Sequence, residues 1–438
     1  MHDITRRDWL ASTIVSLAAT ASGTSAAVPG ERQTGGTVHI SPAVDAAWKL
    51  YYEKVERARQ AIYSSRFSGR PDVQRAANEY FLSLQAVAYT TFMAPRSAYP
   101  LFYVHSRYEP QIFGYGLLNP DFRYRGATVD GARTYRIWGR RGTTRFLDFQ
   151  VDVAPDGRSG PKSEPKNYRL DNFQAGSDGR FEIIASADPH PGNWIALPGS
   201  APHVAISVRE ALYDWEHETL TELHIEVQDD KPLPGPLLSE QEFLQRLEVV
   251  GDMVGYIAEN WGMMLVDLTL RMAEGQRNRF GWQKLPSSAG TNPNANYANC
   301  IYDLADDEAL LIEFDAPTGL YWGIQLGDVY LRSTDAIYHQ SSLNGHQALR
   351  SADGKIRIVL SKQDPGVPNW LDSVDNQLGI IQFRQYFTDA VVPLPKTRVV
   401  DKRKIVDFLP ADTPRISPEQ RGKSLRSRRL AMLRHYGY

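Results

Sequence analysis

The chain has 438 residues, more than one hydrophobic core usually supports, so two domains with additional helices are expected. Its composition, 42% hydrophobic and 23% charged residues, is that of an ordinary globular protein. The net charge of −2 gives no support for nucleic acid or an anionic membrane surface as a partner. The single cysteine, Cys300, excludes an intramolecular disulfide and any multi-cysteine metal site, and the lack of a nucleophile signature around it favours a small buried residue.

Residues 1–27 have the parts of an export signal. Arg6 and Arg7 precede Trp9 and a weakly apolar stretch that ends in small residues. The pattern is similar to the twin-arginine type, Ser/Thr-Arg-Arg-x-Phe-Leu, with Trp9 in the place of Phe. The stretch falls short of the roughly 20 apolar residues that span a membrane. We expect cleavage near Val28 and a periplasmic or secreted protein without a transmembrane segment.

Two helices are expected within residues 28–95. Apolar residues recur at helical spacing from Trp48 to Ile62 and again from Val73 to Val87. The next segment, residues 96–230, carries short aromatic and β-branched runs separated by turn residues, as in a sandwich or jelly roll.

The second half of the chain is expected to repeat this order. Residues 231–300 are predicted as a linker and a helix that starts at the capping box beginning with Ser239. Residues 301–395 are predicted as a second β-domain, and residues 396–438 as a tail with a basic helix. The bases of that helix are interpreted as a solvated face.

A repeated segment joins the two β-domains. Residues 179–195 and 354–371 share a glycine, a base, alternating apolar residues, a serine, an Asp-Pro turn and an Asn-Trp pair. An arginine follows each copy on a strand-like segment, Arg209 in the first and Arg384 in the second. The sequence therefore predicts a mainly β fold with helical additions, built from two tandem homologous β-sandwich or jelly-roll-like domains.

The C-terminal third resembles a known bacterial family. The matching residues are Tyr321-Trp322-Gly323-Ile324-Gln325-Leu326, Asn344, Ala348, Asp353-Gly354, Asp364-Pro365-Gly366-Val367-Pro368-Asn369-Trp370-Leu371-Asp372 and Arg384. They are similar to those of the family called domain of unknown function 1214. Asn119-Pro120-Asp121, Tyr135-Arg136-Ile137-Trp138-Gly139 and the segment 413–421 look like parts of its longer members. The resemblance implies a β-rich, jelly-roll-like fold and no established reaction.

Familiar catalytic motifs are absent from the sequence. It contains no Gly-x-Ser-x-Gly elbow, phosphate-binding glycine loop, dinucleotide fingerprint or His-Glu-x-x-His. His217 and His224 stand seven residues apart, as do His339 and His346. On a helix that spacing is about 11 Å along the axis, too far for two ligands of one metal. The sequence therefore predicts no metal site and no cofactor, and leaves open only a metal site assembled from distant segments.

The duplicated polar residues leave two interpretations open. Arg384 on an apolar strand needs a partner, which is either a structural carboxylate such as Asp364 or Asp372 or the anionic group of a ligand. The structural interpretation is favoured because Asn193, Trp194 and Arg209 repeat the set, and a framework contact duplicates with the fold.

Functional candidates are therefore sought in the second β-domain. His339 and His346 are the catalytic candidates. The ligand-binding candidates are Tyr321, Trp322, Gln340, Asn344, Asn369, Trp370 and Arg384. Our first hypothesis is an exported enzyme that acts on a small organic molecule in a pocket of the C-terminal β-domain. The alternatives are a non-catalytic small-molecule-binding protein and an envelope scaffold.

Overall fold

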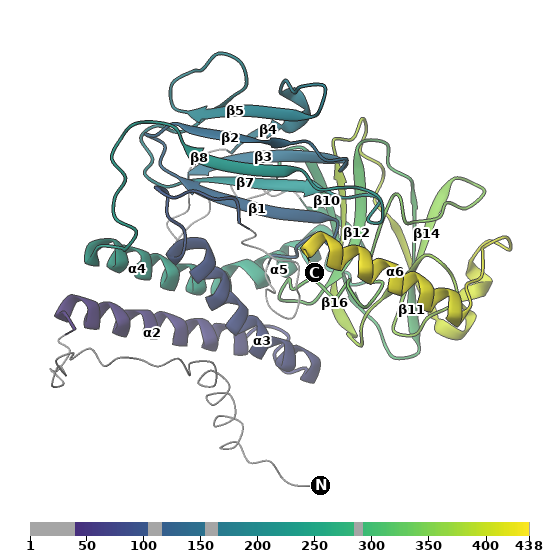
Figure 1. Cartoon of the computed structure of the whole chain (residues 1–438). Coiled ribbons are helices and arrows are strands. Elements are labelled where there is room, and N and C mark those ends of the chain that lie inside the picture. Colours follow the sequence, from purple (N-terminus) through teal and green to yellow (C-terminus); the bar gives the residue numbers. More distant parts are fainter. Residues whose placement is uncertain (1–39, 104–115, 154–164, 284–291, 438) are drawn as a thin grey trace, which may run out of the picture. The chain divides into compact units, whose positions relative to one another are not determined.

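The computed structural model describes residues 40–437 except 104–115, 154–164 and 284–291 (Figure 1). The chain divides into two units, residues 1–41 and residues 42–438, and every helix and strand labelled in Figure 1 belongs to the second. The expected export signal lies outside the described residues. No helix within the described ranges combines the length and apolar character required to cross a membrane.

The first sandwich consists of two four-stranded sheets. Sheet A has the order β1-β7-β3-β4 and sheet B the order β6-β5-β2-β8. The strands are β1 (Phe122–Val129), β2 (Tyr135–Arg140), β3 (Phe146–Val153), β4 (Lys166–Arg169), β5 (Arg180–Ser186), β6 (Trp194–Ala196), β7 (Val204–Ala211) and β8 (Glu222–Val227). Apolar residues of both sheets, among them Ile137, Phe149 and Ile183, fill the space between them.

The second sandwich consists of sheets C and D. Sheet C has the order β13-β12-β16-β10-β9 and sheet D the order β15-β14-β11-β17. The strands are β9 (Gly281–Gln283), β10 (Ala295–Asp303), β11 (Glu308–Asp315), β12 (Tyr321–Gly327), β13 (Ser342–Asn344), β14 (Lys355–Ser361), β15 (Trp370–Asp372), β16 (Leu378–Tyr386) and β17 (Lys396–Asp401). Its core contains Ile324, Ile358 and the buried Cys300, as the sequence predicts for the cysteine.

The two sandwiches repeat each other strand by strand. Strands β1 to β8 correspond in chain order to strands β10 to β17. With this correspondence, sheet A has the same strand order as sheet C apart from the additional strand β9, and sheet B has the same strand order as sheet D. The parallel pairs β5·β6 and β14·β15 also correspond. Gly179 and Gly354 open equivalent hairpins with φ near +80°. The prediction of two tandem homologous β-sandwiches is confirmed.

The expected limits of the second β-domain need correction. The limit at residue 301 falls inside β10, and β17 lies beyond the limit at residue 395. Strand β17 pairs antiparallel with β11, as β8 pairs with β2 in the first sandwich. The exposed side chains of this strand give little apolar signal, which explains why the sequence pattern assigns it to the tail.

Helices precede, separate and follow the two sandwiches. The long ones are α2 (Pro42–Tyr63), α3 (Pro71–Ala88), α4 (Glu240–Tyr256), α5 (Gly262–Met272) and α6 (Pro418–Tyr436). Short helical turns are η1 (Tyr89–Met93), η2 (Leu170–Asn172), η3 (Ile257–Trp261) and η5 (Lys402–Phe408). Ser239 and Ser417 form the capping boxes expected at the starts of α4 and α6.

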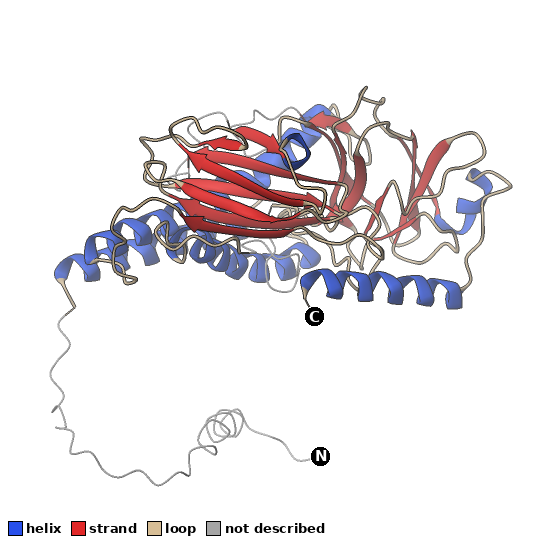
Figure 2. Cartoon of the chain, turned by 45° about the horizontal axis from the view of Figure 1, so that its top comes forward, coloured by secondary structure: helices blue, strands red, loops and turns tan. Residues whose placement is uncertain are grey.

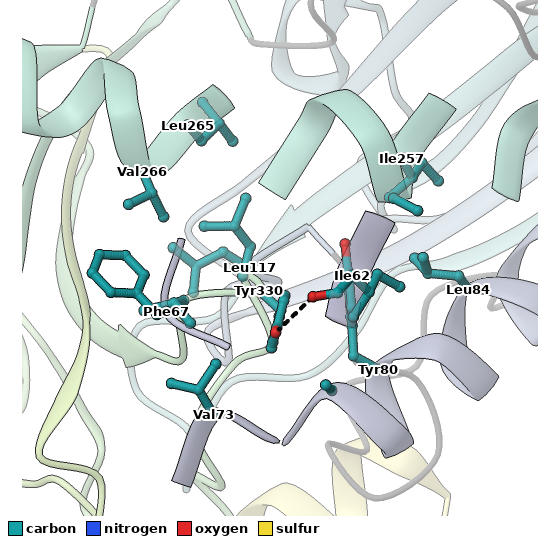
Figure 3. Packing of buried hydrophobic residues seen from close by; sticks show 14 of the residues in the cluster. Ile62, Phe67, Val73, Tyr80, Leu84, Leu117, Ile257, Leu265, Val266 and Tyr330 are labelled. Carbon is teal, nitrogen blue, oxygen red and sulfur yellow. Dashed lines mark hydrogen bonds between the residues drawn. The ribbon is translucent and has the colours of Figure 1, made fainter. Parts of the chain in front are cut away.

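Helices α2 to α5 pack on each other and on one end of the second sandwich (Figure 3). Val73, Ala77, Tyr80, Leu84 and Val87 are all buried, as the helical spacing predicts. Tyr80 stacks on Tyr330 of the second sandwich with ring centroids 4.9 Å apart. The N-terminal helices therefore form a common core with the second sandwich.

Helix α6 lies beside the second sandwich (Figure 2). The expected solvated basic face is correct for Lys423 and Arg426, which are exposed, but not for every base of the helix. Arg421, Arg428 and His435 are buried on its inner side. Arg421 pairs with Asp364 at 2.9 Å, and Arg428 lies 4.4 Å above the ring of Trp215. The arginine stems supply apolar surface and their heads find partners, in addition to the buried Ala431 and Met432.

Candidate functional site

The duplicated Asn-Trp pairs are structural in both halves. The Asn369 side chain donates to the main-chain oxygens of Leu349 and Arg357, at 2.7 and 3.0 Å, and accepts from the Leu349 N–H at 2.8 Å. Asn193 makes the equivalent three bonds in the first sandwich. The indole of Trp370 donates to the Ser361 carbonyl, as that of Trp194 does to Ser186. These residues hold a turn against a hairpin.

The other candidates lie at separate places and bond within the chain. Gln340 accepts a bond from Arg421 and donates to two main-chain oxygens. His339 contacts Asp372 at 2.8 Å, and His346 lies 3.6 Å from Asp214. Trp322 is part of the apolar core of the second sandwich.

Tyr321 and Asn344 meet at a buried carboxylate from the first half. The Tyr321 hydroxyl donates to Asp121 at 2.5 Å, and the Asn344 amide donates to the other oxygen at 2.9 Å. Trp215 supplies a third bond at 2.8 Å. Burial raises the pKa of Asp121, and the three donors oppose that rise. The carboxylate is fully satisfied, so this cluster fastens the two halves together.

A layer of polar residues lies where the outer face of sheet A meets that of sheet C. Aromatic rings close one end of it, where the ring centroids of Phe122 and Phe146 in sheet A lie 5.2 and 5.6 Å from that of Tyr386 in sheet C. We call the polar residues of this region the inter-sandwich layer; they are Tyr124, Asp148, Gln150, Asp152 and Arg209 of the first sandwich and Tyr297, Gln325, Arg384 and Tyr386 of the second. Tyr124, Tyr297 and Arg209 remain half-buried.

Each sheet presents a tyrosine and an arginine side by side in this layer. Tyr124 lies opposite Arg209 across the β1·β7 ladder, and Tyr297 lies opposite Arg384 across β10·β16. Each arginine donates to the side-chain oxygen of a glutamine in its own half, Gln150 for Arg209 and Gln325 for Arg384.

The two arginines also face the opposite half. Arg209 lies within electrostatic reach of Tyr297 and Tyr386, and Arg384 within reach of Tyr124. The hydroxyls of Tyr297 and Tyr386 are hydrogen-bonded to each other at 2.8 Å. The layer is therefore built like the interface of a two-fold symmetric dimer.

The symmetry is broken at the carboxylates of β3. Asp148 lies opposite Arg209 in sheet A, whereas Gly323 takes the equivalent place opposite Arg384 in sheet C. Four residues on, Asp152 corresponds to Gly327. Gly323 leaves room for the Tyr321 hydroxyl of its own strand, and Gly327 leaves room for Leu117 in the chain before β1, because a Cβ at either glycine would collide there.

Asp148 is a carboxylate with one oxygen that accepts no hydrogen bond from the described residues. Its Oδ2 accepts from the amides of Asn167 at 2.8 Å and Asn292 at 2.6 Å. Its Oδ1 is buried without a hydrogen-bond partner in the described part of the chain. Burial raises the pKa of Asp148 above its ordinary value, against the opposing effects of Asn167 and Arg209.

Asp152 resembles Asp148 but accepts fewer hydrogen bonds. Gln150 donates to its Oδ2 at 2.7 Å, its Oδ1 has no partner among the described residues, and burial raises its pKa. Residues four apart on a strand are about 13 Å apart, too far for two carboxylates to share a metal or flank one bond. Within the described ranges no group of three histidine, cysteine or acidic side chains could hold a metal ion. The arrangement is suited to one carboxyl group transferring a proton.

Comparison with known proteins supports the resemblance in the C-terminal third. The family described as "Protein of unknown function (DUF1214)" matches residues 301–390. These residues are a DUF1214 region. No curated protein matches the chain significantly.

Solved structures extend the likeness beyond the DUF1214 region. An uncharacterised protein from Burkholderia cenocepacia is 26% identical, with a TM-score of 0.73 over 82% of this chain and 98% of its own. Because 82% of the chain includes more than one sandwich, the likeness extends to the doubled architecture.

Two weaker matches have low TM-scores. The VPA0106 protein from Vibrio parahaemolyticus is 12% identical, with a TM-score of 0.41 over 80% of this chain and 100% of its own. Salicylate 1,2-dioxygenase from Pseudoaminobacter salicylatoxidans is also 12% identical, with a TM-score of 0.20 over 86% and 96%. Neither likeness informs the fold or the chemistry of this chain.

The DUF1214 region supplies only half of the inter-sandwich layer. It contains Gln325, Arg384 and Tyr386, whereas Asp148 and Arg209 come from the first sandwich. Sequence reasoning missed Asp148 because a strand with alternating polar residues normally turns them to solvent. One signal that the repeat begins earlier was available in the sequence. Asn-Pro occurs at residues 119–120 and again at residues 292–293, and in both places a tyrosine stands four positions after the proline.

Proposed function

We propose that the protein is an exported enzyme that acts on a small organic molecule held in the inter-sandwich layer, with Asp148 as the group that transfers a proton. The sequence alone suggested a pocket in the C-terminal β-domain. The proposal keeps the enzyme class and moves the site to the layer that both sandwiches line.

The observation that carries the proposal is the unpartnered oxygen of Asp148 at a position where the repeat is broken. Framework contacts are kept in both halves, as Asn193 and Asn369 illustrate. A buried carboxylate oxygen without a donor costs free energy, and a catalytic or ligand-binding role is one recognised explanation for it. A hydroxyl of a bound molecule would supply the missing donor.

The surroundings of Asp148 suit proton transfer. Asn167 and Asn292 hold Oδ2 and so fix the plane of the carboxyl group, which leaves Oδ1 directed away from them. A pKa raised by burial lies nearer to neutrality, where a carboxyl group can both accept and return a proton. The reaction class is therefore general acid–base chemistry on a hydroxyl or an acidic C–H, with Arg209 and the tyrosines orienting the substrate.

Replacing Asp148 by asparagine tests this role. Asp148→Asn keeps the shape and the acceptor for both amides but cannot take up a proton. We expect a stable protein that has lost turnover of any substrate found by screening small alcohols, phenols and carboxylates. The matched control is Asp121→Asn, at a buried acid with three donors, which should destabilise the fold and leave turnover in the folded fraction intact. An Asp148→Asn protein with full turnover would refute the proposal.

A non-catalytic binding protein is the second candidate. It is favoured by the half-buried tyrosines, which offer hydroxyls and flat rings to a ligand. In that case Asp148→Asn should weaken ligand binding, and wild-type protein should release every bound molecule unchanged.

A further inference from the structure

We infer that the molecule held in the inter-sandwich layer is a small organic monocarboxylate, and that Arg384 binds its negative charge. This inference rests on the proposed function and adds the chemical class of its substrate. It depends on what Arg384 does and does not contact.

Arg384 is a buried cation whose hydrogen-bond partners are neutral. Only 6% of its surface is exposed. Its guanidinium donates to the side-chain oxygen of Gln325 and to the main-chain oxygen of Leu117. No carboxylate of the described residues lies within ion-pair distance of it, as the ion pairs of this part of the chain show.

Two other enclosed arginines of this chain, Arg125 and Arg332, each have a carboxylate at hand. Arg125 pairs with Glu210 at 2.5 Å, and Arg332 pairs with Asp328 at 2.7 Å. The carboxylates that the sequence suggested for Arg384 are used elsewhere, since Asp364 binds Arg421 and Asp372 binds His339. Burying a charge is costly unless it is paired, so the lack of a countercharge at Arg384 points to one supplied from outside.

The guanidinium retains capacity for such a partner. An arginine carries five N–H donors in a planar fork that matches a carboxylate, and the bonds to Gln325 and Leu117 use only two of them. The half-buried Tyr297 lies beside it, with the guanidinium carbon 5.9 Å from the ring centroid. A flat hydrocarbon portion of the ligand can therefore pack against tyrosine while its carboxylate meets the arginine.

The acids in the same layer limit the charge of the ligand. Asp148 and Asp152 lie on the facing sheet, and a second negative charge on the ligand would be repelled by them. A monocarboxylate therefore fits better than inorganic phosphate or a dicarboxylate. Its hydroxyl or acidic hydrogen would be the group that meets Asp148.

Thermal unfolding with three named probes tests the inference. Benzoate should raise the melting temperature of the full chain in a dose-dependent way, whereas its neutral isostere benzamide and inorganic phosphate should not. Arg384→Met keeps the length of the side chain and removes the charge. We expect it to bind benzoate at least ten-fold more weakly.

Arg332→Met is the matched control, because Arg332 has its own carboxylates. It should lower the melting temperature and leave the benzoate response unchanged. If Arg384→Met fails to fold, crystals of wild-type protein soaked in 4-bromobenzoate provide a second measurement. The anomalous bromine signal should then lie in the inter-sandwich layer, and its absence there would overturn the inference.

The outcomes separate this inference from the proposed function. Equal stabilisation by benzoate and benzamide, no response to benzoate, or a stronger response to phosphate overturns the monocarboxylate. If neutral molecules then bind in a manner that depends on Asp148, the proposed function stands although the inferred monocarboxylate does not. If Asp148→Asn changes neither binding nor turnover while benzoate still requires Arg384, the anion site stands and the acid–base role fails.

Discussion

Gln385 occupies in the second sandwich the position that Glu210 occupies in the first. Both are completely buried, and each directly follows the duplicated arginine of its half. Glu210 accepts bonds from Arg125, Thr144 and Thr221 at 2.5, 2.9 and 2.7 Å. Neither polar atom of the Gln385 amide has a partner in the part of the chain that the structure describes. The duplicated position has thus kept its polarity and lost its partners.

Replacing Gln385 by leucine should stabilise the protein. The change removes two unsatisfied polar atoms at nearly constant volume, which is worth about 1–3 kcal/mol of unfolding free energy. Urea denaturation should show a higher midpoint with an unchanged slope. A lower midpoint would mean that the amide has a partner in solution, such as a buried water.

Glu210→Ala should have the opposite effect. Arg125 would remain enclosed without its carboxylate, and breaking a buried ion pair costs about 3–5 kcal/mol. The same urea series measures this loss. If Gln385→Leu and Glu210→Ala changed the stability in the same direction, the inferred difference in hydrogen bonding between the two positions would be wrong.

Loss of the framework asparagines should cost stability unequally. Asn369→Ala leaves three main-chain groups without a partner in a buried place, which we expect to cost about 2–4 kcal/mol. Asn193 makes the same bonds but is half-exposed, so water can replace part of them and the cost of Asn193→Ala should be smaller. Neither change should alter the response to benzoate. If benzoate no longer raised the melting temperature of Asn369→Ala but still raised that of Asn193→Ala, Asn369 would have to be regarded as a ligand-binding residue.

Much of this architecture could be predicted from the sequence, and the reasons are local. The Asn-Trp turns, the opening glycines and the capping boxes depend on neighbouring residues, so their pattern survives in a single chain. The inter-sandwich layer depends on how sheets A and C meet, which no periodicity encodes. Asp148 and Asp152 alternate with Leu147, Phe149 and Val151 as the solvent face of any strand would.

The same limit applies to the candidate residues of the second half. Asn344 has no visible equivalent in the first half, and the sequence therefore favours a functional role for it. Its partner, Asp121, lies 223 positions away in the chain, so its role as a fastening between the halves could not be inferred. Duplication favours a structural role for Arg384, yet its neutral surroundings support a ligand.

The stability of Asp148→Asn relative to wild type should depend on pH. Burial raises the folded-state pKa of Asp148 above its ordinary value of 3.8, so ionisation is less favourable in the folded than in the unfolded chain. Wild type therefore loses stability as the pH rises from about the unfolded-state pKa through the folded-state pKa. Asp148→Asn lacks this loss, so its advantage should grow over that window and then level off. Chemical denaturation across the acidic to neutral pH range measures it, and an advantage that shrinks as the pH rises would contradict a raised pKa.

The export proposal leads to a prediction at Arg6 and Arg7. The twin-arginine route recognises this pair specifically, so replacing both by lysine, which keeps the charge, should leave the precursor in the cytoplasm. Wild-type protein should appear in the periplasm or medium with an N-terminus near Val28. Arg32→Lys, outside the pair, is the matched control and should be exported normally. Cell fractionation followed by N-terminal sequencing decides the matter, because exported protein that still begins at Met1 would rule out a cleaved signal.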